Sequence, residues 1–131
     1  MERIAASLQD IYEMLLEQGR PSATPTGMCK YRTPEGLRCA VGMCVPFSAY
    51  DGSMEEKPLS SSFVRKVLER SHCQIPLEDL ELAQHCHDQA TQFAIVHDPD
   101  TGRAIGLDLG EWKEYFKKLW ETRVVRRGPL G

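Results

Sequence analysis

Apolar side chains recur at helical spacing in four separate stretches of the chain. In the first, residues 3–18, they follow one another at alternating intervals of four and three, which places them on one face of a helix: Ile4, Leu8, Ile11 and Leu15. Gly19 follows, and Pro21 comes two positions later. Because Gly accepts the left-handed conformation and Pro cannot continue the helical hydrogen bonds, the sequence predicts that this helix ends at residue 18.

Two stretches in the middle of the chain show the same periodicity. Residues 63–71 carry apolar pairs four positions apart, and Ser61 or Ser62 is a suitable N-terminal cap for a short helix there. Pro76 fits the first turn of a longer helix at 77–91. The predicted inner face of that helix consists of Leu80, Ala83, His87 and Ala90.

The fourth helix is predicted at about 110–121, with Asp108 as its cap. Its helically spaced side chains are mostly aromatic: Trp112, Tyr115, Phe116, Leu119 and Trp120. Such a stripe is most simply part of the core, although an exposed Trp would be a strong interface anchor. Residues 123–131 show no apolar period and are predicted to form a flexible tail.

Two short β-hairpins are predicted between these helices. The first spans residues 28–42 around the turn 33–36, where Pro presets φ and Gly permits a positive φ. The second pairs 93–97 with 104–107 across a Pro/Asp/Gly-rich turn, and its flanking runs are rich in β-branched residues. The predicted fold is therefore α+β, with four helices and two short hairpins around one core in a single domain of residues 1–122.

Composition and charge exclude several classes of protein. With 131 residues, 41% hydrophobic and 27% charged, the chain can bury a real core and is neither disordered nor fibrous. No apolar run approaches the ~20 residues that cross a bilayer, so no membrane partner is expected. The net charge of −3 makes nucleic acid an improbable partner. Five cysteines, an odd number, and no signal peptide favour free thiols in a cytoplasm.

The cysteines leave one open question, which is whether the chain binds zinc. Cys29 and Cys39 stand on opposite strands of the first predicted hairpin, and His72 with Cys73 could supply two further ligands. However, nine residues separate Cys29 from Cys39, which is not the spacing of a zinc finger. Free cysteines are also among the most buried residues. The sequence favours core cysteines and no cofactor, with zinc as the alternative.

A second polar cluster lies in His85-Cys86-His87-Asp88. Residues two apart on a helix point about 200° apart, so His85 and His87 cannot bind one ion. His87 falls on the apolar face of its helix, where a buried ring must have hydrogen-bond partners. We therefore interpret His87 as structural.

Candidate binding residues come from the loops. Tyr31 and Arg32 adjoin the first turn, and Arg32 is expected to pair with Glu55. The proposed anchors of a binding face are Tyr50 and Met54 on the irregular loop 45–61 and Arg103 at the second hairpin. No phosphate loop, dinucleotide fingerprint, nucleophile elbow or metalloprotease helix occurs, so no catalytic residue is assigned.

The run from Cys29 to Gly42 follows the pattern C-x-Y-R-x-x-x-G-x-x-C-A-V-G. With it the chain resembles a group of small proteins encoded by tailed bacteriophages and prophages. Other features shared with that group are Pro46, Tyr50, Met54-Glu55, His87-Asp88 and Trp112. The resemblance implies a viral origin and the cytoplasm of a bacterial host, and it brings no established activity.

Two functions are compatible with these observations. The first is a phage accessory protein that binds a bacterial host protein stoichiometrically, as inhibitors of host defence of the anti-CRISPR type or of host enzymes do. The alternative is a small metal-assisted hydrolase or nuclease that uses Cys29, Cys39 and the region of His87 and Asp88. Since no acid and base stand at a recognisable catalytic spacing, we favour the binding protein.

Overall fold

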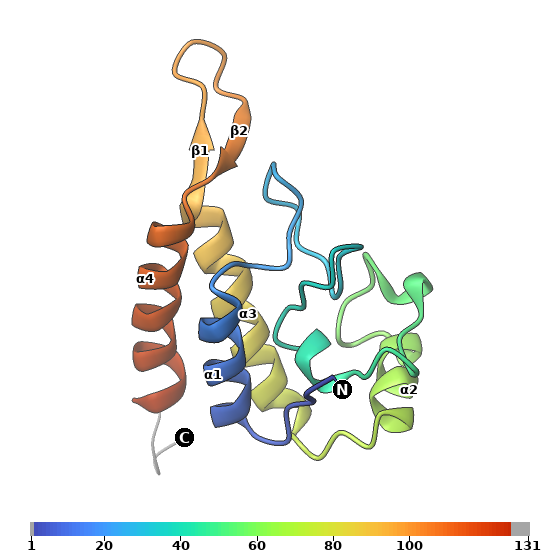
Figure 1. The fold of residues 1–131 in the computed structure, drawn as a ribbon. Coiled ribbons are helices and arrows are strands. Elements are labelled where there is room, and N and C mark those ends of the chain that lie inside the picture. The colour runs from blue at the N-terminus through green and yellow to red at the C-terminus, as the bar shows by residue number, and fades with distance from the viewer. Residues whose placement is uncertain (1, 127–131) are drawn as a thin grey trace.

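A computed structural model describes residues 2–126 of the chain. It confirms the α+β class with four helices: α1 (Leu8–Gln18), α2 (Ser62–Arg70), α3 (Leu77–Ala94) and α4 (Leu109–Trp120). Strands β1 (Ile95–His97) and β2 (Ala104–Leu107) form one antiparallel hairpin between α3 and α4. Helices α1, α3 and α4 lie side by side, α2 stands on the far side of the irregular loops, and the hairpin extends beyond the helices (Figure 1).

Helix α1 begins at Leu8, five residues after the predicted start at Arg3, so the predicted start was wrong. Ser7 is the cap, because its hydroxyl accepts the backbone N–H of Asp10 at 3.1 Å. The segment before it is instead tied to the core, where the Ala5 N–H donates to the Met43 carbonyl at 2.8 Å. The predicted end is confirmed, since Gly19 takes the left-handed conformation with φ 72°.

The other helices begin where their caps predict. The Ser61 hydroxyl accepts the N–H of Phe63, and the Asp108 carboxylate accepts the N–H of Glu111. Helix α3 runs one turn further than expected, to Ala94, so β1 begins only at Ile95. A π-helical turn, Glu121–Val125, continues α4 into the segment expected to be a tail, and its Val124 is buried. Residues 127–131 of that tail lie outside the described part of the chain.

Aromatic side chains fill the core between α1, α3 and α4. The rings of Trp112 and Phe116 stack with centroids 5.1 Å apart, and Tyr12 of α1 packs on Phe116 at 5.7 Å. The Trp112 indole N–H donates to the Thr91 hydroxyl of α3 at 3.1 Å, which satisfies its one polar atom in the core. Trp112 and Trp120 are thus core residues and not interface anchors. Among residues 2–126, no helix is both long and apolar enough to cross a membrane.

The first predicted hairpin does not form strands. Its turn is as expected, with the Gly36 N–H donating to the Thr33 carbonyl at 2.9 Å and Gly36 at φ 90°. In the described chain a single isolated bridge, between Arg32 and Arg38, joins the two arms of the turn, and Cys29 bridges to Ala23 outside the predicted hairpin. Side chains take the place of a ladder, because the Arg38 N–H donates to the Gln18 carboxamide instead of to a facing strand.

The β1–β2 hairpin forms as predicted and contains a bulge. Ile95 pairs with Leu107 and Val96 with Gly106, and the register shifts before His97 meets Ala104. The loop carrying Gly27 lies against its base. Gly27 has φ 93°, and a Cβ at that position would come within 2.6 Å of the Ile95 side chain, so only glycine fits there.

Candidate functional site

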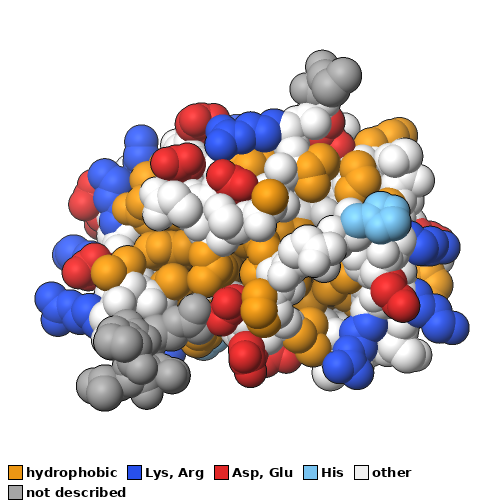
Figure 2. Space-filling model, turned by 90° about the horizontal axis from the view of Figure 1, so that it is seen from below, with side chains coloured by type: hydrophobic (Ala, Val, Ile, Leu, Met, Phe, Trp, Pro, Cys, Tyr) orange, Lys and Arg blue, Asp and Glu red, His pale blue; other side chains and the backbone are white. Residues whose placement is uncertain are grey.

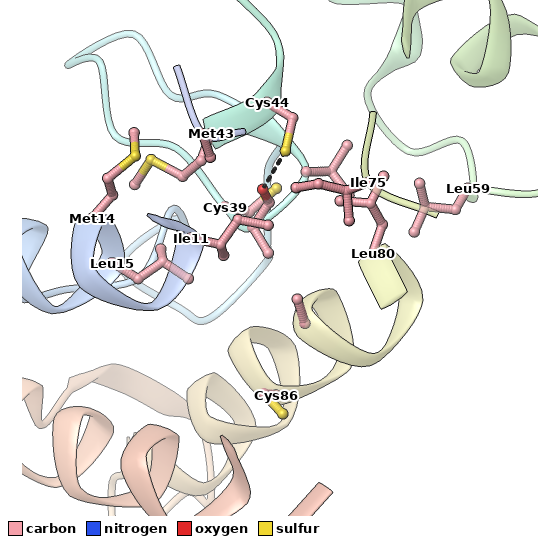
Figure 3. Close-up of a cluster of buried hydrophobic side chains, with 14 of the residues drawn as sticks. Ile11, Met14, Leu15, Cys39, Met43, Cys44, Leu59, Ile75, Leu80 and Cys86 are labelled. Carbon is pink, nitrogen blue, oxygen red and sulfur yellow. Dashed lines mark hydrogen bonds between the residues drawn. The ribbon is translucent and has the colours of Figure 1, made fainter. Parts of the chain in front are cut away.

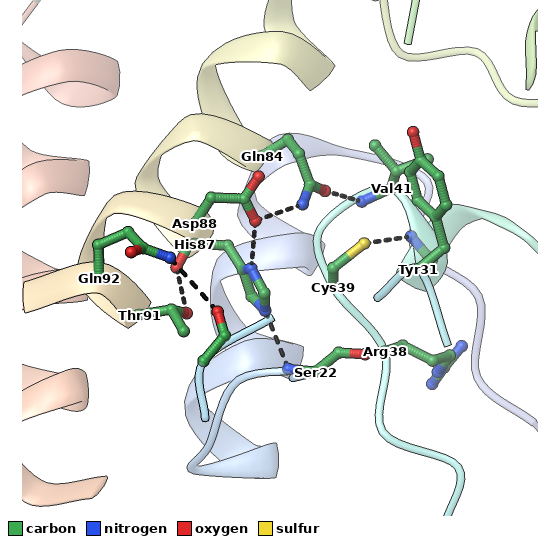
Figure 4. Close-up of polar contacts among 12 residues, drawn as sticks. Ser22, Tyr31, Arg38, Cys39, Val41, Gln84, His87, Asp88, Thr91 and Gln92 are labelled. Atoms are coloured by element: carbon green, nitrogen blue, oxygen red, sulfur yellow. Dashed lines mark hydrogen bonds and ion pairs between the residues drawn. The ribbon is translucent and has the colours of Figure 1, made fainter. Parts of the chain in front are cut away.

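Helix α3 holds the loop that precedes residue 42 through a chain of hydrogen bonds, which we call the His87 relay: Ser22, Val41, Gln84, His87 and Asp88 (Figure 4). The Ser22 backbone N–H donates to His87 Nε2 at 3.0 Å. His87 Nδ1 and Gln84 Nε2 both contact Asp88 Oδ1, at 2.8 and 2.7 Å. The side-chain carbonyl oxygen of Gln84, Oε1, in turn accepts the Val41 backbone N–H at 3.0 Å. The relay therefore fixes the loop to α3 at two points.

The partners of His87 determine where its proton lies. Since Nε2 accepts the Ser22 N–H, the neutral ring carries its proton on Nδ1 and donates it to Asp88. Both nitrogens are occupied, and the ring is fully buried. The prediction of a buried, hydrogen-bonded His87 is confirmed.

Cys29 joins this relay. Its sulfur, a His87 ring nitrogen and an Asp88 oxygen lie within 4.8 Å of one another, which is a spacing that three ligands of one metal ion can have. The zinc set suggested by the sequence, Cys29 with Cys39, His72 and Cys73, is different, and these four do not converge in the described chain. His72 is exposed at the end of α2.

The hydrogen bonds of His87 do not suit a metal ligand. A histidine that binds a metal through one nitrogen donates its other N–H to an acceptor. If His87 bound a metal through Nδ1, its Nε2 would carry the proton and would face the N–H of Ser22, which is itself a donor. Binding through Nε2 would displace Ser22 altogether. The ring is placed for a structural hydrogen bond, and a metal would require the Ser22 segment to move.

The cysteine in the relay is also a poor nucleophile. Burial, followed by the nearby Asp88 carboxylate, raises the pKa of the Cys29 thiol to about 12. Burial likewise raises the pKa of Cys39, which is fully buried and accepts the Gly42 N–H. Since the thiolate is the reactive form, neither sulfur is activated for attack on a substrate.

A second group of contacts centres on the Glu55 carboxylate. One oxygen accepts the backbone N–H of Tyr31 at 2.9 Å, and the other accepts the N–H of Arg32 at 3.1 Å and the Tyr50 hydroxyl at 2.6 Å. These contacts fasten the irregular loop to the first turn. Carboxylate hydrogen bonds to several donors are among the stronger ones in proteins.

The predicted pairing of the Arg32 side chain with Glu55 is wrong. The Arg32 guanidinium instead binds Glu2 at 2.8 Å and donates to the Val45 carbonyl at 3.2 Å. It also lies over the rings of Phe47 and Tyr50, with distances of 5.4 and 5.7 Å to the centroids. Glu55 is already occupied by backbone donors, so Arg32 is free to hold the N-terminal segment.

The two groups of contacts border a common cleft of about 340 Å³. Its walls include Cys29, Tyr31, Glu55, Gln84 and Asp88, together with Lys30 and Lys57. The polar atoms that face it are mostly engaged within the protein, as described above. The polar groups that line the cleft therefore serve mainly to hold the structure together, and they do not form a set of unpaired catalytic groups.

The other predicted binding residues lie elsewhere. Met54 is fully buried in the core, so the prediction that it anchors a binding face is wrong. Arg103 is exposed beside β2, far from the cleft along the chain. Ser22 and Gln84 were missed. The spacing of four between Gln84 and Asp88 was a signal for Gln84. Ser22 contributes its backbone N–H, which leaves no signal in the sequence.

Comparisons of the chain with protein-family models, with curated proteins and with solved structures found no match.

Proposed function

We propose that this chain is a phage-encoded accessory protein that acts in the cytoplasm of a bacterial host by binding a host protein stoichiometrically. In that role it would inhibit a host defence system, as anti-CRISPR proteins do, or a host enzyme. The observation that carries the proposal is the β1–β2 hairpin, which extends away from the helices (Figure 1). On it Ile105 is 61% exposed and Val96 42% exposed.

The exposure of these apolar side chains supports the proposal of a binding partner, because exposed apolar surface does not stabilise the fold of the chain itself. A two-stranded hairpin is only marginally stable by itself. Apolar side chains that stay exposed to water on it contribute little to folding stability, because their surface is not buried. Arg103 flanks them, and Arg beside apolar groups is typical of binding hot spots. Short strands with a bulge also protect the free edges from uncontrolled pairing, so such a hairpin can remain exposed.

The surface charge supports a protein partner over nucleic acid. At the end of the molecule opposite the hairpin, acidic and basic side chains are interspersed around apolar ones (Figure 2). This agrees with the net charge of −3. Proteins that grip nucleic acid without sequence preference present a continuous basic surface, whereas the described residues on that face show separate basic side chains with acidic ones between them (Figure 2).

A small metal-assisted hydrolase or nuclease is the second candidate, and the convergence of Cys29, His87 and Asp88 beside the cleft favours it. The orientation of His87 counts against it, because the Ser22 N–H occupies the nitrogen that a metal ligand would need to keep as a donor. Elemental analysis of protein purified without added metal tests this candidate. Stoichiometric zinc that is lost in Cys29→Ser would replace the binding proposal.

The binding proposal is tested by capture from host lysate followed by titration calorimetry with the captured protein. We expect a saturating complex of fixed stoichiometry. Ile105→Asp should weaken it by about tenfold or more, because a charge replaces an apolar contact. Val125→Asp is the matched control, since Val125 is 55% exposed but lies on the π-helical turn after α4, and it should bind as the parent does. Full inhibition at about a hundredfold molar deficit would instead indicate turnover.

A further inference from the structure

A glutamate near the start of the chain is bound by groups from the loops. Glu2 Oε2 lies 2.8 Å from Arg32 Nη1 and 4.0 Å from Arg38 Nη1. Its other oxygen, Oε1, accepts the backbone N–H of Phe47 at 2.9 Å. Both carboxylate oxygens are therefore engaged, by two guanidinium groups and one backbone donor. Charge-assisted contacts of this kind are the ones with which proteins recognise carboxylates.

The two arginines are built into the protein and are not free surface side chains. The Arg32 side chain is 9% exposed and that of Arg38 is 12% exposed. Arg32 lies over the rings of Phe47 and Tyr50. It also donates to the Val45 carbonyl at 3.2 Å, so contacts within the loops hold its guanidinium in place.

Two neighbouring buried cations need an anion. Guanidinium groups stay charged at ordinary pH, and a buried charge without a partner is costly. Burial lowers the pKa of Arg38, and the Glu2 carboxylate opposes that shift. In the described chain no acid other than Glu2 lies within ion-pair distance of Arg32 or Arg38. The fold therefore requires an anion at this position, and Glu2 is the one that the chain supplies.

The carboxylate and the groups that bind it come from different parts of the chain. Glu2 precedes Ser7, the cap of α1, and so lies on a segment outside the helix. The Ala5 N–H of that segment donates to the Met43 carbonyl at 2.8 Å. Met43 belongs to the buried core, where its side chain points towards Met14 of α1 (Figure 3). The core thus fixes the binding groups, whereas the carboxylate arrives on a separate short segment.

A cavity of about 270 Å³ borders the same arginine. Its walls are formed by Arg32, Thr33, Pro34, Gly36, Phe47 and Tyr50. The Phe47 side chain is 71% exposed and offers an apolar surface there. A carboxylate that replaced that of Glu2 would have room in this cavity for the rest of its molecule.

We propose that Arg32, Arg38 and the Phe47 N–H form a carboxylate-binding site, which Glu2 fills from within the chain and which a carboxylate of another molecule fills when Glu2 is removed. In the intact chain Glu2 is tethered beside the site, so it competes there at a high effective concentration. The site opens to other carboxylates only when the segment before α1 leaves it. None of these residues belongs to the β1–β2 hairpin, so the proposal is independent of host-protein binding.

The test is the stability of full-length Glu2→Ala in sodium formate, because formate is a carboxylate with no side chain. Urea denaturation is measured at increasing formate and at sodium chloride of the same ionic strength, which screens surface charges equally. A ligand that binds only the folded state lowers the unfolding equilibrium constant about elevenfold at about ten times its Kd. We expect this saturating response to formate and not to chloride. An equal response of Glu2→Ala to both salts would overturn the proposal.

The parent and a matched variant show whether the response belongs to this site. In the parent Glu2 fills the site, so formate and chloride should act alike. Glu13→Ala is the matched control, because Glu13 also lies near an arginine, 3.8 Å from Arg3 Nη2, but its side chain is 50% exposed. This variant should respond as the parent does, and a formate response as large as that of Glu2→Ala would contradict the assignment.

A second measurement locates the bound ion and does not depend on stability. In nitrogen–proton correlation spectra of Glu2→Ala, the Phe47 amide signal should shift with formate and saturate at the same Kd, whereas that of Ile105 on the hairpin should not move. If Glu2→Ala is unfolded in chloride, formate should restore the spectrum of the folded protein. A Phe47 signal that ignores formate, or a variant that formate leaves unfolded, would each overturn the proposal.

Discussion

Replacing His87 by alanine removes the central member of the relay. The ring is fully buried and packs edge-on against Trp112, with centroids 5.9 Å apart. Its loss leaves the Ser22 N–H, on a residue with 0% exposure, without an acceptor. An orphaned buried donor costs about 1–3 kcal/mol, and the cavity left by the ring adds a term of about 1–2 kcal/mol. We expect His87→Ala to lower the free energy of unfolding by roughly 2–5 kcal/mol.

Urea denaturation followed by circular dichroism measures this change, and an unaltered slope of free energy against urea would show that the unfolded state is the same. His85→Ala is the matched control, because His85 lies on the same helix but is exposed, with its ring nitrogen 3.1 Å from the Arg123 guanidinium. We expect a change of less than about 0.5 kcal/mol for it. If His87→Ala were as stable as the parent yet unable to act on its partner, the structural interpretation would be refuted.

Two further predictions concern the other polar contacts. Glu55→Gln turns one carboxylate oxygen into an amide donor that faces other donors, so the free energy of unfolding should fall by about 1–2 kcal/mol. Glu56 is exposed, so Glu56→Gln should leave the free energy of unfolding unchanged in the same urea assay. The hydrogen bond from Arg32 lowers the pKa of Glu2 below its ordinary value of 4.5. The Glu2–Arg32 pair therefore stabilises the fold fully above about pH 4.5, and this stabilisation is lost as the pH falls through the pKa of Glu2 in the folded state. Thermal melts at a series of pH values should therefore show a weaker acid destabilisation for Glu2→Gln than for the parent, and equal slopes would contradict the pairing.

The sequence predicts the helices well because their signals are local. Ser61 and Asp108 cap the helices they were expected to cap, and Gly19 ends α1. The start of α1 was missed because Ile4 continues the apolar period, yet the segment around Ala5 gains more by hydrogen bonding to Met43 in the core. That contact joins residues 38 positions apart, and no local pattern encodes it.

The first hairpin and the site show the same limit more clearly. The turn at Gly36 was correct, but the strands beside it lose their ladder because distant side chains satisfy the backbone. Glu55 takes the N–H groups of Tyr31 and Arg32, and Gln84 takes that of Val41. A side chain that accepts from a remote backbone group looks in the sequence like any surface polar residue. The sequence therefore indicated several of the polar residues that form these contacts, whereas it did not indicate which backbone groups they bind.

Gly27 has a consequence for the base of the hairpin. The hairpin meets the rest of the molecule partly through the Ile95 side chain, which sits where a Cβ at position 27 would be. The base of the hairpin is thus in close contact with a residue outside it, on a loop that α3 and the His87 relay hold in place. A methyl group at position 27 would displace the Ile95 side chain or the loop itself, and it would also strain a backbone that has φ 93°. A substitution in the loop can therefore disturb the base of the hairpin without any change in the sequence of the hairpin itself.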